Sequence, residues 1–280
     1  MIQIDCWRWY RRLGPAGKEW IPGMPVNRPF VYDSTVTHEY QHRIHAYWNP
    51  ADELFMNEGC SMYAELLCGY GIDPSYINSY LYTPDNSLTI WGDQGDINIL
   101  ADYGAAALWT IYLSDHYGGA DTIRHFVQAG IPGIDGVNAA LAYAGYTKAT
   151  FDTVYHDWRI ANLIHTSFLG CDKYNYKSLN LSDPSIIPAF THTFSGLPVP
   201  KTKGTDFGTT QTILGYDTGV SELGPYSSDY IVFNNWRKLG LIKFKGDETA
   251  FYGWSLTTDG WFSNGENLMD ALLIGKAYVD

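Results

Sequence analysis

The chain contains few basic residues. Its 280 residues include 18 Lys and Arg against 30 Asp and Glu, which gives a formal net charge of −12, and no basic run is longer than the pair Arg11–Arg12. Binding to nucleic acid or to an anionic membrane surface requires a concentration of positive charge. The sequence also lacks a run of eighteen apolar residues, which a membrane-spanning helix needs. We therefore expect no nucleic acid among the partners and no membrane span.

Cysteine is equally scarce, and its spacing excludes a thiolate zinc site. The four cysteines, Cys6, Cys60, Cys68 and Cys171, form no CxxC pair. Cys60 and Cys68 lie in one predicted helix, about 12 Å apart along its axis, which is too far for a disulfide. The first residues have no apolar core of a secretion signal. The abundance of Tyr, Trp, Asn and Gly nevertheless suggests a secreted or cell-surface protein, so we expect an export signal upstream of Met1.

Helical spacing of apolar residues dominates the first two thirds of the chain. Two short strands, Ile2–Ile4 and Phe30–Tyr32, are predicted before the first helix, for which Asp33 and Ser34 suit the N-cap. Residues 73–96, rich in turn formers, are predicted to form a loop. Helices are predicted at 36–48, 52–68, 99–119, 121–129, 137–143 and 150–164.

The pattern changes after residue 184. A linker-like stretch rich in Pro, Gly, Ser and Thr runs to residue 204, and short β-branched segments follow at the spacing typical of a β-sandwich. Strands are predicted at 209–214, 230–233, 241–244, 251–256 and 272–279. We place a domain boundary near residue 200.

His38, Glu39 and His42 form an H-E-x-x-H motif inside the first predicted helix. Residues four apart lie one turn above each other, so both imidazoles leave the same face of the helix and suit one tetrahedral cation. Glu39 is rotated by about 100° from His38. Its carboxylate would lie beside a metal ion, where it can accept a proton from water.

A catalytic zinc site needs a third protein ligand. His45 is excluded because it extends the same ridge of the helix, and the metzincin pattern fails because Trp48 stands where that pattern needs His. The turn at Asn49–Pro50 reverses the chain, so Glu58 on the next helix can face the two histidines. Glu65 is two turns further on the same face and suits a carboxylate that holds a ligand imidazole by its remaining N–H.

Three segments resemble the gluzincin metallopeptidases of the hyicolysin and immune inhibitor A type. They are STVTHEYQHRIHAYWNP, FMNEGCSMYAELLCGYG and ADYGAAALWTIYLSDHYGG. In that family H-E-[FY]-Q-H supplies two zinc ligands and the general base, and N-E-G supplies the third ligand. The resemblance spans about residues 30–164 and implies His38, His42 and Glu58 as zinc ligands, with Glu39 as the base.

The resulting fold-class prediction is α+β: a mostly helical zincin (gluzincin) catalytic domain over residues 1–200 and a β-sandwich-like domain over 201–280. The second domain more loosely resembles the β-sandwich modules that follow such catalytic domains. Only 37 residues precede His38, too few for the sheet that zincins place before the metal helix. We therefore expect a fragment of a longer precursor, a cleft completed in another way, or a loss of activity.

Two further sets of residues are candidates for roles at the site. Gluzincins add a Tyr or His that donates a hydrogen bond to the oxyanion, and Tyr103 is our candidate, ahead of His125, His156 and His165. The second set suits calcium as a second cofactor and lies in the predicted loop, although its spacing is not that of an EF-hand. It comprises Asp85, Asp93 and Asp96.

The sequence therefore favours a secreted zinc endopeptidase that acts on proteins or peptides. Glu39 would take a proton from the attacking water and deliver it to the leaving amine. The alternative is a catalytically inactive surface or adhesion protein that keeps the zincin scaffold. It is prompted by the missing upstream sheet and by the 16% content of aromatic residues.

Overall fold

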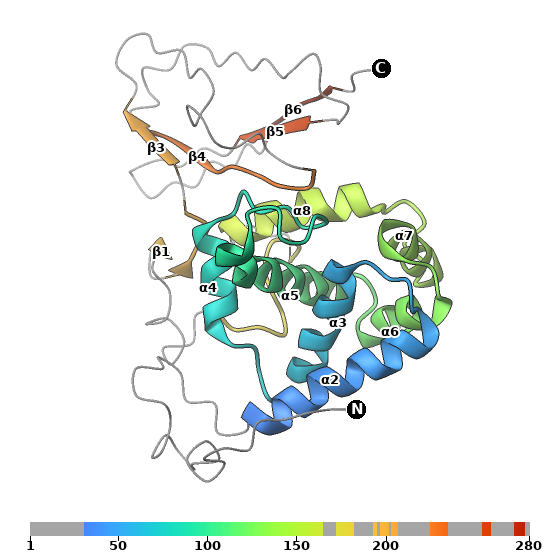
Figure 1. Ribbon diagram of the computed structural model, residues 1–280. Helices are drawn as coiled ribbons and strands as arrows, with labels where there is room; N and C mark the ends of the chain where they lie inside the picture. Colours follow the sequence, from blue (N-terminus) through green and yellow to red (C-terminus); the bar gives the residue numbers. More distant parts are fainter. Residues whose placement is uncertain are drawn as a thin grey trace. The chain divides into compact units, whose positions relative to one another are not determined.

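The computed structural model describes residues 31–164, 172–181, 193–194, 197–201, 203–206, 225–234, 254–258 and 272–277 (Figure 1). Its long elements are helical. They are α2 (Val31–Trp48), α3 (Leu54–Leu67), α4 (Pro74–Tyr82), the short 3-10 helix η2 (Asp96–Asn98), α5 (Ile99–His116), α6 (Ala120–Ala129), α7 (Gly133–Tyr143) and α8 (Phe151–Ile164).

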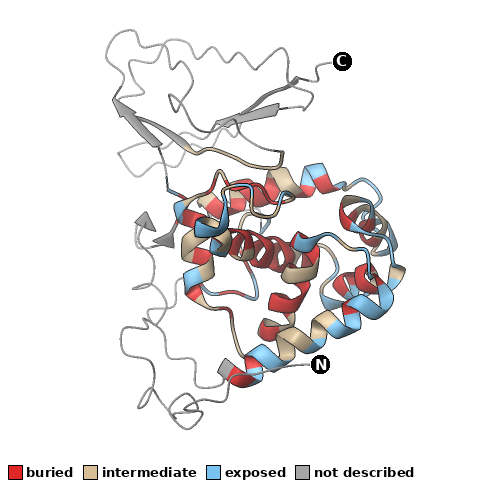
Figure 2. Ribbon diagram, in the orientation of Figure 1, coloured by how far each residue is buried: buried red, intermediate tan, exposed pale blue. Residues whose placement is uncertain are grey.

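Helix α5 is the centre of the hydrophobic core. Nearly all of its side chains from Ala101 to Ser114 are buried, and α3, α4, α6 and α8 pack around it (Figure 2). A helix that is apolar on all sides is stable only when neighbours cover it completely. The small residues Gly104 to Ala107 let those neighbours approach closely. A Cβ atom on Gly104 would lie 2.1 Å from the carbonyl oxygen of Tyr76 in α4.

The start of α2 differs from the prediction. Val31 and Tyr32 are helical, so the predicted strand at Phe30–Tyr32 is wrong for these two residues, and Phe30 lies outside the described residues. Asp33 and Ser34 lie inside the first turns of the helix and are not its cap. Ser34 is buried and donates a hydrogen bond to Glu65 in α3. Packing against α3 thus extends the helix beyond the local capping signal.

Helix α4 falls in the segment predicted as a loop. Asp73 is its N-cap and accepts a hydrogen bond from the backbone N–H of Ser75 at 2.9 Å, and Pro74 occupies the first helical position. An acidic cap followed by proline is a helix-start signal. The segment was predicted as a loop because turn-forming residues dominate its composition.

The described strands are short and pair only in twos. Each pair forms a two-stranded sheet of its own. The pairs are β1 (Thr193–Phe194) with β2 (Leu197–Pro198), β3 (Lys203–Asp206) with β4 (Ile231–Asn234), and β5 (Trp254–Thr258) with β6 (Leu272–Ala277). The predicted α+β fold class is therefore wrong for the described part of the chain, whose long elements are all helices and whose strands are isolated short pairs. Apolar alternation predicts strands, but a sandwich also requires them to join into two stacked sheets. The predicted strands at 2–4, 209–214 and 241–244 lie outside the described residues.

The chain divides into two compact units. One contains residues 1–203 and 220–230, and the other contains residues 204–219 and 231–280. The first unit thus includes a returning segment, residues 220–230, that the predicted division near residue 200 assigns to the second domain. Among the helices that the structure describes, none has the length and apolar character to cross a membrane.

Candidate metal centre

The site is built by α2 and α3, which the turn after Trp48 brings side by side. His45, fully buried in α2, places its Nε2 2.7 Å from Oδ2 of Asp52 in the turn. The other oxygen of Asp52 accepts the backbone N–H of Gly133 at 2.7 Å. Asn49 donates from Nδ2 to the carbonyl of Ile131 at 3.2 Å. These contacts fix the reversal of the chain, and they explain why His45 is a structural residue and not a ligand.

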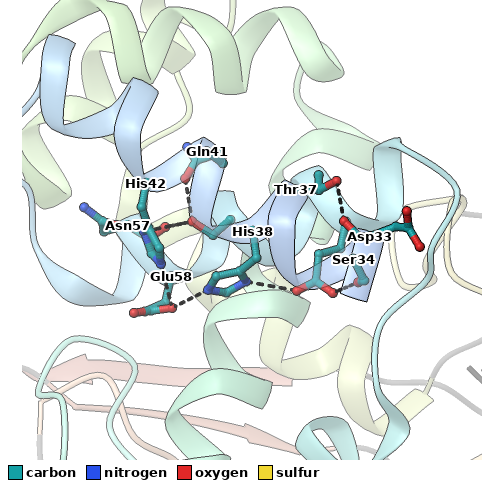
Figure 3. Close-up of polar contacts among 10 residues, drawn as sticks. Asp33, Ser34, Thr37, His38, Gln41, His42, Asn57 and Glu58 are labelled. Carbon is teal, nitrogen blue, oxygen red and sulfur yellow. Dashed lines mark hydrogen bonds and ion pairs between the residues drawn. The ribbon is translucent and has the colours of Figure 1, made fainter. Parts of the chain in front are cut away.

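His38, His42 and Glu58 converge across the two helices. One ligand atom from each lies within 4.8 Å of the others, and no other His, Cys, Asp or Glu group of this kind occurs in the described ranges. Figure 3 shows both imidazoles directed towards Glu58. Oε2 of Glu58 lies 3.1 Å from Nε2 of His38 and 3.5 Å from Nε2 of His42.

These separations suit a tetrahedral metal site. With metal–ligand distances of about 2.0–2.1 Å, neighbouring ligand atoms of a tetrahedron lie about 3.3–3.4 Å apart. The distances of 3.1 and 3.5 Å from Glu58 to the two imidazoles bracket this value. All three side chains are mostly buried, with 15–24% of their surface exposed. Two imidazoles and a carboxylate also form a donor set that zinc prefers, so these residues fit the ion.

The outward-facing nitrogen of each imidazole has its own acceptor. Nδ1 of His38 lies 2.9 Å from Oε1 of Glu65, and the hydroxyl of Ser34 holds the other oxygen of that carboxylate. Nδ1 of His42 lies 2.5 Å from Oδ1 of Asn57 and 3.0 Å from the hydroxyl of Ser61. A hydrogen on each Nδ1 leaves the lone pair on Nε2, where Glu58 lies.

The position of Glu65 agrees with the sequence prediction, whereas the other supporting residues were missed. Asn57 immediately precedes the predicted ligand Glu58, so the sequence indicates that it lies near the site. The sequence does not indicate its contact with Nδ1 of His42. Ser61 donates to Oε1 of Gln41 at 2.5 Å and thereby links α3 back to α2. The roles of Ser34 and Ser61 depend on how the two helices are set against each other, which no short motif specifies.

The site is electrostatically suited to a cation. Burial alone would lower the pKa of His38, but hydrogen bonds with Glu58 and Glu65 raise it to about 9. Burial alone would raise the pKa of Glu58, but hydrogen bonds with His38 and His42 lower it to about 2. In the absence of metal, the carboxylates therefore stabilise a positive charge on an imidazole.

Tyr103, near the start of α5, lies within the electrostatic reach of the site. Burial raises its pKa to about 12, and the carboxylates of Glu58 and Glu39 act in the same direction. Its ring stacks on Tyr76, with the centroids 5.4 Å apart, and meets Trp91 edge-on at 5.0 Å. The phenol is thus neutral at ordinary pH and held in place by aromatic neighbours. Glu39 is half-buried and does not belong to the converging group.

Gly59, which follows Glu58, allows α3 to lie against α5. A Cβ atom at this position would lie 2.2 Å from Oγ1 of Thr110 and 2.7 Å from the carbonyl oxygen of Ala106. A side chain there would push the helices apart and displace Glu58. The glycine of the N-E-G sequence therefore has a packing reason that is independent of any family resemblance.

The remaining candidates from the sequence do not join the site. His125 stacks on Tyr143 at a centroid distance of 3.7 Å, and His156 lies on α8. His165 lies outside the described residues. Asp85, Asp93 and Asp96, predicted for calcium, do not bring three carboxylates within 4.8 Å of one another. Cys60 is buried and Cys68 is exposed, and both are free thiols.

Comparisons with known proteins add no assignment. No protein-family model matches the chain, and a search of curated proteins finds no similar sequence.

Proposed function

We propose that the protein is a zinc-dependent endopeptidase of the gluzincin type, with His38, His42 and Glu58 as the zinc ligands. The proposal rests on the convergence of these three side chains from two helices within 4.8 Å. It is supported by the acceptors that hold both Nδ1 atoms, because ligand imidazoles characteristically have such partners. Three protein ligands leave one tetrahedral position for water, as in catalytic zinc sites.

The chemistry follows from the residues around that position. Bound there, zinc would lower the pKa of a water molecule to about 7 and polarise a peptide carbonyl. Glu39 would accept the proton of the attacking water and pass it to the amine nitrogen as the peptide C–N bond breaks. Tyr103, kept neutral by its raised pKa, would donate a hydrogen bond to the oxyanion.

Zinc content and casein cleavage test the proposal together. We expect about one zinc per purified full-length chain by elemental analysis, loss of cleavage with a chelator, and recovery when zinc is restored. A His42→Ala variant should lose both zinc and cleavage. Cleavage that persists in metal-free protein, or a chain that binds no zinc, would refute the proposal.

A binding protein without catalytic activity is the second candidate, and one observation favours it. Apolar side chains lie exposed along α2, with exposed fractions from 39% for Val36 to 78% for Tyr47, and Tyr40 and Ile44 lie between them. Such a row of side chains suits contact with another protein. Zinc binding without cleavage of any protein substrate would favour this candidate.

A further inference from the structure

Residues 225–230 belong to the part of the chain that returns to the unit with the metal centre. The stretches before and after this returning part, residues 204–219 and 231–280, belong to the other unit. Its partners are distant in sequence. The carbonyl oxygen of Pro225 accepts the hydroxyl of Ser87 at 2.5 Å, and that of Tyr226 accepts the backbone N–H of Leu88 at 2.9 Å. Residues 225–230, here called the strap, therefore lie against the stretch that follows α4.

Arg159, buried in α8, connects the strap to the same stretch. Its Nη2 donates to the carbonyl of Pro84 at 2.8 Å and to that of Ser228 at 2.9 Å, and its Nη1 donates to the hydroxyl of Tyr80 in α4. The guanidinium lies 4.9 Å from the ring centroid of Tyr230, whose hydroxyl donates to the carbonyl of Arg159 at 2.8 Å. Arginine presents five N–H donors in one rigid plane, so a single side chain can bind several oxygen acceptors.

Tyr226 has a backbone conformation that bulky residues rarely adopt, with φ at 52°. Such a conformation persists only where the surroundings hold it, and it is found often at functional positions. The ring of Tyr226 meets Phe151 and Tyr155 edge-on, at centroid distances of 4.8 and 5.2 Å. Its hydroxyl donates to Oδ1 of Asp152 at 2.7 Å. The ring, the hydroxyl and the backbone carbonyl of this one residue are therefore each held by a different partner.

The stretch that the strap contacts continues to the neighbours of Tyr103. The ring of Trp91 meets Tyr103 edge-on, with the centroids 5.0 Å apart. The next residue, Gly92, donates its N–H at 3.0 Å to Oδ1 of Asp102, which immediately precedes Tyr103. Only two residues separate Leu88 from Trp91, so the position of Leu88 limits where the indole ring can lie. The strap thus acts on Tyr103 through one short piece of chain.

We propose that the strap places Tyr103 for catalysis, with Tyr226 as a positioning residue. By holding residues 84–88 against α8, it keeps the ring of Trp91 against Tyr103. The strap contacts α8 and the connection between α4 and α5, whereas the proposed zinc ligands lie on α2 and α3. Loosening it should therefore alter turnover without altering zinc binding. The effect on turnover rests on the proposed function, but the placement of the Tyr103 ring does not.

Nuclear Overhauser effects between the rings of Trp91 and Tyr103 test the placement without any need for activity. In selectively labelled full-length protein we expect cross-peaks for the wild type and their loss in Tyr226→Ala, together with faster hydrogen exchange at the N–H of Leu88. Tyr143→Ala removes a tyrosine that is 61% exposed on α7, and it should leave both signals unchanged. Cross-peaks as strong in Tyr226→Ala as in the wild type would overturn the inference.

Kinetics on casein or a peptide test the catalytic role. Displacing a catalytic group by about 1 Å can cost about 10²-fold in rate, so Tyr226→Ala should lower kcat by about 10- to 100-fold, with KM and zinc content nearly unchanged. In a Tyr103→Phe background the same change should have little further effect on kcat, because both residues act through one hydroxyl. Equal fold losses in the two backgrounds would show that Tyr226 does not act through Tyr103.

A second variant serves if Tyr226→Ala does not fold. Ser87→Ala removes the hydroxyl that donates to Pro225, and it should weaken the cross-peaks between the two rings and lower kcat in the same way. A folded Ser87→Ala protein with wild-type cross-peaks would overturn the inference equally. If the wild type cleaves no substrate, the proposed peptidase function fails, and the cross-peaks alone decide whether the strap places Tyr103.

Discussion

Oε1 of Glu65 lies 2.9 Å from Nδ1 of His38, while Oε2 of Glu58 lies 3.1 Å from Nε2 of the same ring. The two glutamates are seven residues apart on α3 and therefore point from one face of that helix. One imidazole of α2 is thus held between two carboxylates of its neighbour. Glu65 fixes the orientation of the ring, and Glu58 lies where a metal ion would be bound.

Replacing Glu65 by Gln should weaken zinc binding without removing a ligand. Partners of ligand imidazoles typically contribute about 10- to 100-fold to metal affinity, so we expect a loss in that range. Glu58→Gln should cause a larger loss, because it removes a proposed ligand. Competition with a chromophoric chelator measures both. Glu53→Gln, an exposed residue at the start of α3, is the matched control and should bind zinc normally. Equal affinities for Glu65→Gln and wild type would exclude the supporting role.

Glu39→Gln should separate metal binding from turnover. The amide keeps the size of the side chain but cannot accept a proton, so we expect zinc content to remain while kcat for casein or a peptide falls by about 10²- to 10⁴-fold. Tyr40→Phe changes the adjacent exposed side chain and should retain activity. A Glu39→Gln enzyme with substantial turnover would refute the role of general base.

Tyr103→Phe should lower kcat and leave KM and zinc content nearly unchanged. The hydroxyl would act only on the charge that develops during the reaction, and loss of one oxyanion donor costs about 10²- to 10³-fold. The ring itself is retained, so its contacts with Tyr76 and Trp91 should persist. Tyr47→Phe, with 78% of its residue surface exposed, serves as the control. A change in KM alone would indicate that Tyr103 contacts substrate without stabilising the transition state.

The sequence supports the local part of the site better than its surroundings. The i, i+4 spacing of His38 and His42 and the reversal at Asn49–Pro50 were enough to expect Glu58 opposite them, and seven-residue spacing was enough to suggest Glu65. The contacts of Ser34 and Ser61 could not be inferred, because they depend on the distance and rotation between α2 and α3. The loop prediction for residues 73–96 was wrong at α4 for another reason. Turn-forming residues dominate this segment, although Asp73 and Pro74 provide a helix-start signal. Alternating apolar residues later in the chain do not specify how strands join into sheets.

Gly59→Ala should destabilise the protein and disturb the metal centre. The new methyl group would lie 2.2 Å from Oγ1 of Thr110 and 2.7 Å from the backbone of Ala106, so α3 must shift. Overpacking of this kind typically costs about 1–3 kcal/mol, or several degrees in Tm. Adding Thr110→Ala removes the first of the two clashes and should restore part of the stability. A Gly59→Ala variant as stable as the wild type would show that the two helices do not approach so closely.

The metal-free protein should be most stable in weakly acidic solution. The pKa of His38 is raised from its ordinary 6.5 to about 9, so its stabilising contribution is complete below pH 6.5 and disappears as the pH rises through 9. The pKa of Glu58 is lowered from 4.5 to about 2, so its contribution is complete above pH 4.5 and disappears as the pH falls through 2. Both contributions are present between these limits, from pH 4.5 to 6.5.

Thermal unfolding with and without zinc measures this dependence. From pH 6.5 to 9 we expect the Tm of the metal-free wild type to fall more than that of Glu58→Gln, by an amount that corresponds to about 1–3 kcal/mol for the one ion pair. Zinc should act in the opposite direction. Because it must displace the proton from His38, the rise in Tm on adding zinc should increase over the same range. Identical pH profiles for wild type and Glu58→Gln would mean that Glu58 does not stabilise a proton on His38.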